Sequence, residues 1–320
     1  MLKDSANTTP AVMDQVLLAL VPGAACLVYY FGIGILINVV VSIAAATATE
    51  ALVLRARTLP PAILADRSAI VTGALLGLSL PPFLPLWMAV LGASFAMIFG
   101  KHLYGGLGQN PFNPAMAGYA MMIVAFPLAM SLWPSPGPAS SPPAVLSWKM
   151  GAPVSDAITM ATPLDAFRFR GNETVAGFWT TSAAVAGFAG KGWQWINVAF
   201  LAGGIYLCYR RICDWVMPSA MLAALGVLAA TFYDGGSARS LGSPLFHWLS
   251  GATMMAAFFI VTDPVTSPDG LAGRIIFGTG VGILVFTIRS IGAYPDGIAF
   301  AVLLMNATAP LLDQVRRRRT

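Results

Sequence analysis

Residues 15–54 read QVLLALVPGAACLVYYFGIGILINVVVSIAAATATEALVL, forty residues with a single charged side chain, Glu50. A helix crosses the hydrocarbon core of a bilayer with about 20 consecutive apolar residues. The stretch is therefore long enough for two successive crossings, which we expect near residues 14–32 and 33–54. It indicates a membrane protein.

The rest of the chain has the same character. Hydrophobic residues make up 57% of it and charged residues only 10%, whereas soluble domains carry about 25% charged residues. Eight further apolar stretches are candidate spans: 68–80, 83–100, 113–132, 193–209, 216–232, 244–262, 274–289 and 297–312. We therefore predict an all-α polytopic membrane protein with about ten transmembrane helices.

Basic residues in short loops predict the orientation, because such loops prefer the cytoplasm. With the N-terminus inside, 12 of the 18 Lys and Arg fall on the cytoplasmic side. Both termini are then cytoplasmic, and the chain divides into a first transmembrane half (1–132), a periplasmic loop (133–192) and a second transmembrane half (193–320). The tail Arg316–Arg319 is expected to anchor the topology or to contact anionic membrane lipid, so the net charge of +5 requires no nucleic-acid partner.

The predicted periplasmic loop contains the most informative short motif of the chain, Asp156-Ala-Ile-Thr159-Met-Ala161-Thr162. It resembles the pattern Asp-x-x-Ser/Thr-x-Ala-Thr of proteins that carry flavin mononucleotide (FMN) as a phosphoester on the last threonine. This resemblance makes Thr162 the attachment residue and Asp156, Thr159 and Ala161 the motif around it.

The same region also has the pattern of a helix start. Thr162 would be the N-cap, Pro163 would occupy the first helical position, and Asp165 would lie in the first turn. As a cap, Thr162 needs no cofactor, so the two interpretations of this threonine stand side by side.

Other residues could complete or imitate such a site. Arg168 or Arg170 could neutralise the phosphate and Phe178 or Trp179 could stack on the flavin ring, but each could equally be a plain surface residue. A second partial match, Ser250-Gly-Ala-Thr253, has His247 in place of the acid and lies in an apolar span. Small residues there indicate close helix packing, so we do not expect Thr253 to carry flavin.

Three further segments extend the comparison over nearly the whole chain: Asn110-Pro-Phe-Asn113-Pro-Ala115, Thr262-Asp-Pro-Val-Thr-Ser-Pro268 and Tyr294-Pro-Asp-Gly-Ile-Ala-Phe300. They are similar to the RnfD/NqrB family, membrane subunits of the Rnf and sodium-pumping NADH:quinone oxidoreductase complexes. The acceptor Thr-Met-Ala-Thr and the lack of a long N-terminal extension favour the Rnf branch over the quinone reductase branch, which usually has Ser-Gly-Ala-Thr.

The resemblance implies a subunit in a bacterial inner membrane that passes electrons between NADH and ferredoxin, coupled to sodium or proton movement. It implies covalent FMN on Thr162, added by a separate flavin transferase, and a non-covalent flavin, riboflavin, near Asn110 and Asn113. These two asparagines could instead simply cap helices.

Partner subunits would supply what this chain lacks. The resemblance implies partners with the NADH and FMN site, the iron–sulfur clusters, a second covalent flavin and further membrane spans. The chain itself offers no catalytic acid or base, and its three cysteines do not have the spacing of a zinc or iron–sulfur site: Cys26, Cys208 and Cys213.

A faint internal symmetry predicts two inverted five-helix repeats with broken helices. The first half has Gly73-Ala74, a break at Pro81-Pro82, Lys101 and Asn113; the second has Gly251-Ala252, a break at Asp263-Pro264, Arg289 and Asp296. Inverted repeats with broken helices are typical of transporters. The alternative hypothesis is therefore a small-solute transporter or channel, which would not explain the flavin motif.

Overall fold

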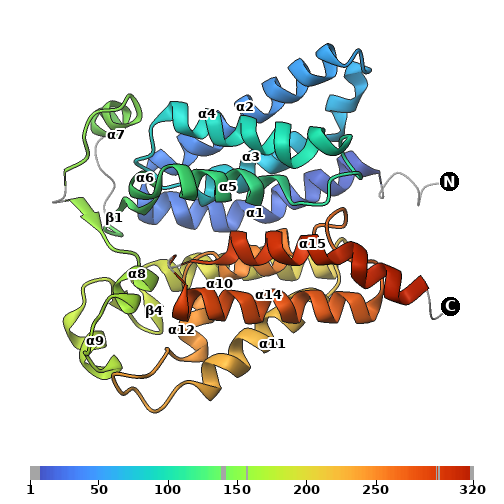
Figure 1. The fold of residues 1–320 in the computed structure, drawn as a ribbon. Helices are drawn as coiled ribbons and strands as arrows, with labels where there is room; N and C mark the ends of the chain where they lie inside the picture. The colour runs from blue at the N-terminus through green and yellow to red at the C-terminus, as the bar shows by residue number, and fades with distance from the viewer. Residues whose placement is uncertain (1–7, 138–141, 156–157, 293, 295, 318–320) are drawn as a thin grey trace. The chain divides into compact units, whose positions relative to one another are not determined.

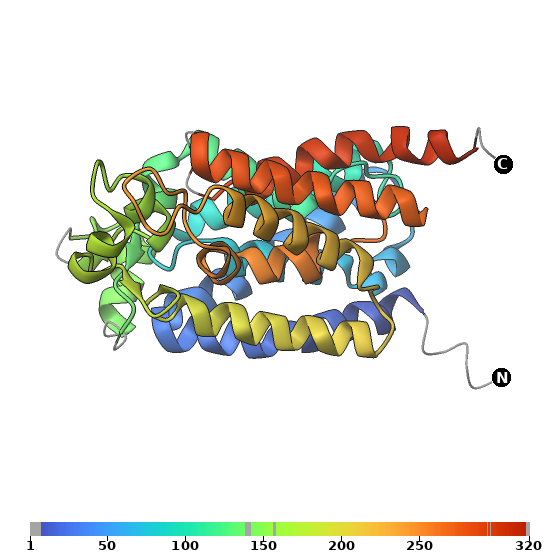
Figure 2. The same cartoon turned by 90° about the horizontal axis from the view of Figure 1, so that it is seen from below.

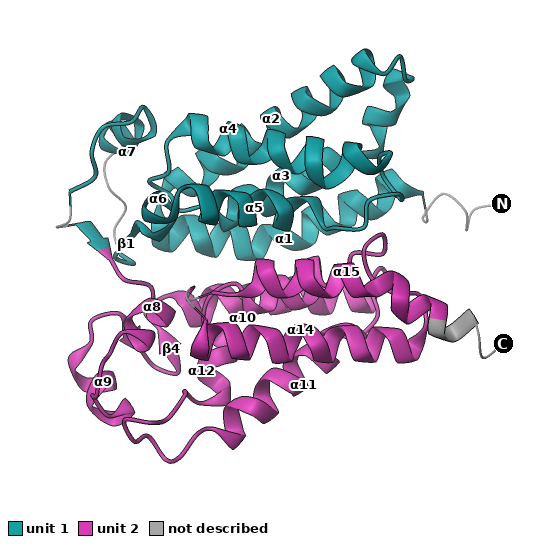
Figure 3. Ribbon diagram, viewed as in Figure 1, with its two compact units in different colours: residues 1–159 teal, residues 160–320 magenta. Residues whose placement is uncertain are grey.

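The computed structural model describes residues 8–137, 142–155, 158–292, 294 and 296–317. The chain forms two compact units, residues 1–159 and residues 160–320 (Figure 3). The boundary lies inside the segment 133–192, so residues 133–159 belong to unit 1 and residues 160–192 to unit 2. The division at residues 132 and 192 refers to a membrane and stays a prediction.

Unit 1 is helical almost throughout (Figure 1). Its elements are α1 (Thr9–Phe31), α2 (Ile33–Ala56), the 3-10 helix η2 (Pro61–Asp66), α3 (Ser68–Ser79), α4 (Leu86–Phe95), the π-helical η3 (Ala96–Lys101), the 3-10 helix η4 (His102–Tyr104), α5 (Pro114–Ala125), α6 (Pro127–Ser131), the short strand β1 (Trp133–Pro134) and α7 (Pro142–Lys149).

Prolines set two of the helix ends in unit 1. The residue before a proline is disfavoured in the α region, and both Leu80 (φ −83°, ψ 141°) and Phe126 (φ −134°, ψ 55°) leave it. The first interrupts the chain between α3 and α4, and the second separates α5 from α6. The expected span 113–132 is therefore two helices.

Glycines allow α2 and α3 to pack backbone against backbone. A Cβ on Gly73 would lie 2.5 Å from Cα of Ile43, and one on Gly77 would lie 2.6 Å from Cα of Val39. Small residues at this spacing are the usual means of close helix packing in membranes. The approach buries one face of α2, which carries three polar residues and an alanine at intervals of four: Asn38, Ser42, Ala46 and Glu50.

Unit 2 begins with short elements and continues with long helices (Figures 1 and 2). The strand β2 (Thr159–Met160) spans the boundary. It is followed by α8 (Pro163–Arg168), α9 (Val175–Thr181), β3 (Val185–Ala186), β4 (Ala189–Gly190), α10 (Trp193–Tyr209), α11 (Val216–Thr231), α12 (Pro244–Leu249), α13 (Thr253–Met255), the π-helical η6 (Ala256–Ile260), α14 (Leu271–Ile291) and α15 (Ile298–Arg317).

The short elements of unit 2 gather at one end of its long helices. β3 and β4 form an antiparallel hairpin in which Val185 pairs with Gly190 and Ala186 with Ala189. In both views α8 and α9 lie at the same end of the unit as α12, beyond the tips of α10 and α14 (Figures 1 and 2). This end holds the motif that resembles a flavin acceptor.

The structure agrees with a helical membrane protein. Each of the ten apolar stretches contains helix, and four helices are long and apolar enough to cross a bilayer: Thr9–Phe31, Ile33–Ala56, Leu86–Tyr104 and Leu271–Ile291. Ten crossings and an inverted repeat stay predictions. The expected correspondence between Gly73-Ala74 and Gly251-Ala252 does not hold locally. Gly73 lies within a regular helix, whereas Gly251 lies in a helix break with φ +58°.

Candidate functional site

Thr162 is the N-cap of α8, as the helix-start pattern predicts. Its hydroxyl accepts a hydrogen bond from the Asp165 backbone N–H at 3.2 Å and donates one to Oδ2 of the Asp165 carboxylate at 2.6 Å. Pro163 takes the first helical position, where a missing N–H costs nothing. The residue is half-buried, so its hydroxyl lies at the edge of the unit rather than in the core.

The rest of the motif runs along the surface into this cap. Thr159 lies in β2 and is half-buried, and Ala161 is exposed directly before the cap. Asp156 lies outside the described residues. Ile158 and Met160 are half-buried like Thr159, so Ala161 is the exposed residue among the described part of the motif.

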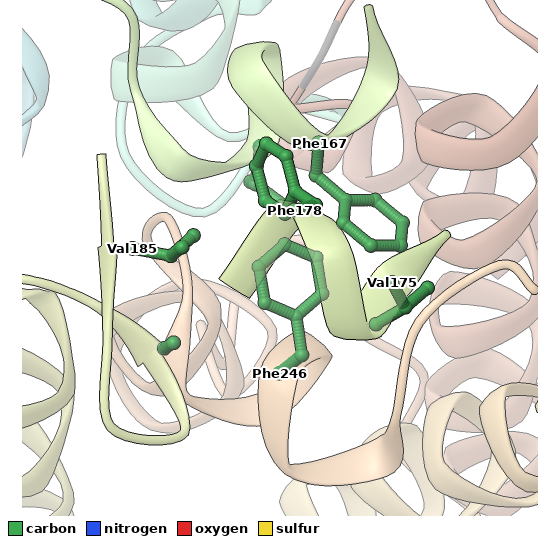
Figure 4. Packing of buried hydrophobic residues seen from close by; sticks show 7 residues of the cluster. Phe167, Val175, Phe178, Val185 and Phe246 are labelled. Carbon is green, nitrogen blue, oxygen red and sulfur yellow. The ribbon is translucent and has the colours of Figure 1, made fainter. Parts of the chain in front are cut away.

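A small apolar core holds α8 and α9 in place (Figure 4). It comprises Leu164, Phe167, Val175, Phe178, Val185, Ala189 and Phe246. The rings of Phe167 and Phe178 meet edge to face with centroids 5.7 Å apart, and that of Phe246 lies 4.7 Å from that of Phe167. Burying such aromatic side chains is worth about 2 kcal/mol each, enough to order short helices that would not form alone.

This core corrects the expectation for Phe178. Its side chain is only 3% exposed and forms part of the core, so it does not present a face for stacking on a flavin. Trp179 packs partly against the same core and donates its indole N–H to the carbonyl of Gly187 at 2.9 Å. In helices of only six or seven residues, such as α8 and α9, sequence periodicity cannot tell which side chains are buried and which are exposed.

The two arginines at the end of α8 bind carbonyl groups. Arg168 donates to the carbonyls of Arg289 at 2.8 Å and Ile291 at 3.2 Å, at the C-terminal end of α14. Arg170 donates to the carbonyls of Ala238 at 3.2 Å and Ser240 at 2.5 Å, and its guanidinium lies 3.9 Å from the centroid of the Phe167 ring. Both guanidinium groups hold α8 against the rest of unit 2, and their role as phosphate ligands stays a prediction.

An ion pair with a buried guanidinium lies next to α8. Arg289 donates to Oδ1 of Asp296 at 3.0 Å, to the carbonyl of His247 at 2.9 Å and to Oγ1 of Thr253 at 3.0 Å. Oδ2 of Asp296 accepts the backbone N–H of Ala252 at 3.2 Å. The pair therefore ties the end of α14 to the break between α12 and α13.

Gly251 brings α8 onto this break. A Cβ at that position would lie 2.5 Å from Oδ2 of Asp296 and 2.8 Å from Cδ1 of Leu164, and the φ of +58° is one that glycine adopts without strain. The position therefore requires glycine for two reasons. In the sequence, the only indication of this requirement was that Gly251 lies between two small residues, Ser250 and Ala252, in an apolar stretch.

The environment of Asp165 favours its protonated form. Burial raises the pKa of this carboxyl, and the nearby negative charge of Asp296 raises it further, while the hydrogen bonds with Thr162 act in the opposite direction. A carboxyl that holds a proton next to Thr162 can donate a hydrogen bond to an anionic group on that residue. An ionised one would repel it.

Thr253 has a structural role, as expected. Its side chain is fully buried, and its hydroxyl donates to the carbonyls of His247 at 2.8 Å and Ser250 at 2.9 Å while it accepts from Arg289. Its one proton and one of its acceptor positions are used inside the unit. An enzyme could not reach it without unfolding the break.

Asn110 and Asn113 lie in unit 1 and are both buried. Asn113 caps α5, because its Oδ1 accepts the backbone N–H of Met116 at 3.1 Å, which confirms the capping interpretation for this residue. Asn110 donates to the carbonyl of Phe112 at 3.0 Å, and its Oδ1 has no partner among the described residues. The riboflavin assignment stays a prediction.

Unit 1 also contains a buried charge cluster that sequence reasoning did not assemble. The ammonium of Lys101 contacts the carboxylate of Glu50 and lies 2.6 Å from Oγ of Ser68 and 3.7 Å from the carboxylate of Asp66. His102 lies 3.5 Å from the same Glu50 oxygen. Glu50 and Lys101 are 51 residues apart, and no local pattern connects them.

Residues 3–320 match the model of the NQR2, RnfD, RnfE family. The chain belongs to this family. Among its relatives is an ion-translocating oxidoreductase complex protein of Pseudomonas aeruginosa strain UCBPP-PA14, named as one of the subunits of that complex. The two chains are 48% identical over 316 residues, which cover 98% of this chain and 92% of the relative.

Two more distant relatives give the same result. The chain is 44% identical over 326 residues to a protein of Cellvibrio japonicus (98% of this chain, 91% of the relative) and 44% identical over 320 residues to one of Alcanivorax borkumensis (98% and 93%). Both carry the same name as the Pseudomonas aeruginosa relative, that of an ion-translocating oxidoreductase complex component. The resemblance inferred from the motifs is confirmed.

Proposed function

We propose that this chain is a membrane component of an ion-translocating oxidoreductase complex of the Rnf type, which passes electrons between NADH and ferredoxin. The observation that carries the proposal is the similarity, over nearly the full length of both chains, to proteins named as components of such complexes. The helical architecture with several strongly apolar helices is consistent with it. The coupled ion would be sodium or a proton.

The same proposal assigns FMN to Thr162 as a phosphoester. What supports the assignment is that Thr162 is half-buried and follows the exposed Ala161, so the residue is not enclosed in the core. Thr253, the other partial match, is fully buried, and its hydroxyl is hydrogen-bonded to His247, Ser250 and Arg289. The flavin would supply reversible electron transfer when attached.

The chain's own residues would position that group. The apolar core and the carbonyl contacts of Arg168 and Arg170 hold α8 against the rest of unit 2. The carboxyl of Asp165, whose Oδ2 lies 2.6 Å from Thr162 Oγ1, would stand next to the attached phosphate. Partner subunits would bring the NADH site, the iron–sulfur clusters and the second covalent flavin.

Two further assignments belong to this proposal. The Oδ1 of Asn110, which has no partner among the described residues, would suit an N–H of a non-covalent flavin such as riboflavin. The basic residues would place both termini in the cytoplasm of a bacterial cell and the segment 133–192 in the periplasm.

The test is ultraviolet fluorescence of the denatured protein band after expression with a flavin transferase. Thr162→Asn keeps a side chain that caps a helix but removes the hydroxyl, so the band should be dark although the protein folds. Thr174→Val is the matched control, since Thr174 caps α9 by accepting the Gly177 N–H at 3.1 Å. It should lose about 1 kcal/mol of stability with its cap and keep its fluorescence.

One observation favours the second candidate, a transporter. In each unit a buried asparagine of a long helix hydrogen-bonds the carbonyls of a helix break: Asn38 those of Leu80 and Pro81, and Asn197 those of Leu249 and Gly251. Broken helices in two halves are typical of transporters. A dark wild-type band, from cells that flavinylate another protein, would refute the FMN assignment and favour this candidate.

A further inference from the structure

Lys149, the last residue of α7, is buried inside unit 1. Its side chain is 1% exposed, although its neighbours Leu146 and Met150 are 55% and 74% exposed. The ammonium donates hydrogen bonds to Oδ1 of Asn38 on α2 and to the carbonyl of Leu84 at 3.0 Å. A lysine is almost never buried in this way unless it is paired with a carboxylate.

The group enters the helix break between α3 and α4. The amide N–H₂ of Asn38 already donates to the carbonyls of Leu80 at 3.2 Å and Pro81 at 2.9 Å. Prolines at 81, 82 and 85 prevent a regular helix here, so carbonyl oxygens that a helix would satisfy need other donors. Unwound carbonyls and helix C-termini are the groups that hold cations in broken-helix membrane proteins.

In the part of the chain that the structure describes, no opposite charge balances this ammonium. Among the described residues, no carboxylate lies within ion-pair distance of Lys149. Of the elements packed against it, residues 80–85 carry no titratable group. On α2 the charged residues are Glu50 and Arg55, and Glu50 lies three turns beyond Asn38, roughly 18 Å along the helix, where it contacts Lys101.

We propose that the helix break of unit 1 is a proton-binding site, in which the amine of Lys149 takes up and releases one proton. The ammonium lies where a free monovalent cation would bind among the oxygen atoms of the helix break. The neutral amine keeps two N–H donors, which match the two acceptors, Asn38 Oδ1 and Leu84 O. Deprotonation therefore changes the charge of the break by one without breaking its hydrogen bonds.

The energetics agree with this geometry. Burial lowers the pKa of the Lys149 ammonium to about 7, and no neighbouring charge contributes to the shift. Both forms are then populated near neutral pH. Lys101 has a different environment, since the carboxylate of Glu50 contacts it directly as a counter-ion inside the same unit.

The first test uses the wild-type protein and competitive acetylation, because only the neutral amine reacts. The extent of labelling at Lys149 is followed by mass spectrometry between pH 5 and 11 and divided by its own plateau, with the exposed Lys191 as the reference for the reagent. At pH 7 we expect about half of the plateau, whereas a free lysine amine would give roughly 1 part in 2500. The profile of a free lysine at Lys149 would overturn the proposal.

The second test compares Lys149→Met, always neutral, with Lys149→Arg, always charged, in membranes that contain the whole complex. It rests on the proposed function. Both variants should transfer electrons within about twofold of wild type but translocate at least about tenfold fewer ions per electron, and both should lose the pH dependence of translocation near pH 7. Lys191→Met is the control and should behave as wild type.

The outcomes separate the two proposals. If Lys149→Met and Lys149→Arg both translocate ions with the wild-type rate and pH profile, Lys149 has a structural role only and the proton site is refuted. If the wild-type complex neither transfers electrons nor moves ions, the proposed function fails. The labelling profile then still decides whether Lys149 titrates near neutral pH.

Discussion

The substitution Lys149→Met tests the buried amine through the pH dependence of stability. In the folded protein burial lowers the pKa of Lys149 to about 7, and in the unfolded chain a lysine titrates near 10.4. Between these values the unfolded state binds more protons than the folded state, so the free energy of unfolding rises with pH in this window. Below pH 7 the group is charged in both states, and the full cost of burying the ammonium is present.

The size of the effect follows from the two pKa values. A pKa of about 7 in the folded protein against 10.4 in the unfolded chain corresponds to roughly 5 kcal/mol over the whole window. Between about pH 7 and pH 8.5 the wild-type protein should gain about 1.5 kcal/mol relative to Lys149→Met. For a chain of 320 residues this is about 2 °C in the midpoint of thermal unfolding.

The measurement is thermal unfolding of the purified chain in detergent at several pH values from 6 to 9. The absolute offset between the two proteins is not decisive, because methionine also leaves Asn38 Oδ1 and Leu84 O without a donor, at a cost of about 1–3 kcal/mol each. The slope of the difference against pH is decisive. Parallel curves for wild type and Lys149→Met would show that the amine keeps its proton on burial and would refute the reasoning, while Lys191→Met should run parallel to wild type.

Three further predictions concern unit 2. Gly251→Ala should lower the midpoint of thermal unfolding and the yield of flavin on Thr162, since the new Cβ meets Asp296 at 2.5 Å in a conformation that costs alanine about 1–2 kcal/mol by itself. Arg289→Met should cost about 3 kcal/mol by leaving Asp296 unpaired, and the double variant with Asp296→Asn should recover part of it in a double-mutant cycle; additive losses would argue against the pair. Burial raises the pKa of Asp165, so above about pH 3.9 the folded state binds more protons at this carboxyl than the unfolded state does. The free energy of unfolding should therefore fall as pH rises through that region. Asp165→Asn should abolish this fall in a pH series of chemical unfolding.

Local signals in the sequence predicted the helices and their caps. Apolar runs of about 20 residues located α1, α2 and α14, and an Asn or Thr followed by proline located the starts of α5 and α8. These features depend on residues within one turn or one helix of each other, so a single sequence contains them. The helix start at Thr162 is a clear example, since cap, proline and acid lie within one turn.

Contacts between segments that are distant in the sequence could not be predicted from such local signals. Lys149 reaches Asn38 across 111 residues, and Arg168 reaches the carbonyl of Arg289 across 121. Phe178 looked like a candidate for stacking because an aromatic residue in a polar loop has no neighbours in a sequence, whereas in the structure Phe246 and Phe167 enclose it. Which polar residue is buried depends on these contacts, and so the charged members of both sites were found only in three dimensions.

Both helix breaks leave carbonyl oxygens without helical N–H donors, and a different cationic side chain binds them in each unit. A broken helix frees carbonyl oxygens, and in each unit an asparagine supplies its amide donors to two or more of them. A cationic side chain donates to a further carbonyl at each break. Lys149 donates to Leu84 O in unit 1, and Arg289 donates to His247 O in unit 2.

The choice of cation determines what each break can do. Guanidinium groups stay protonated in proteins, and Arg289 has Asp296 as its counter-ion, so the break next to α8 carries a fixed, balanced charge that suits a rigid support for Thr162. An amine can lose its proton, and among the described residues Lys149 has no counter-ion to prevent it. Exchanging the cations tests this argument: Lys149→Arg should fix the charge of the unit 1 break, and Arg289→Lys should keep fluorescence at Thr162 if Asp296 holds the new ammonium charged. A dark Arg289→Lys band in a protein that still folds would show that the fork of the guanidinium, and not its charge, supports α8.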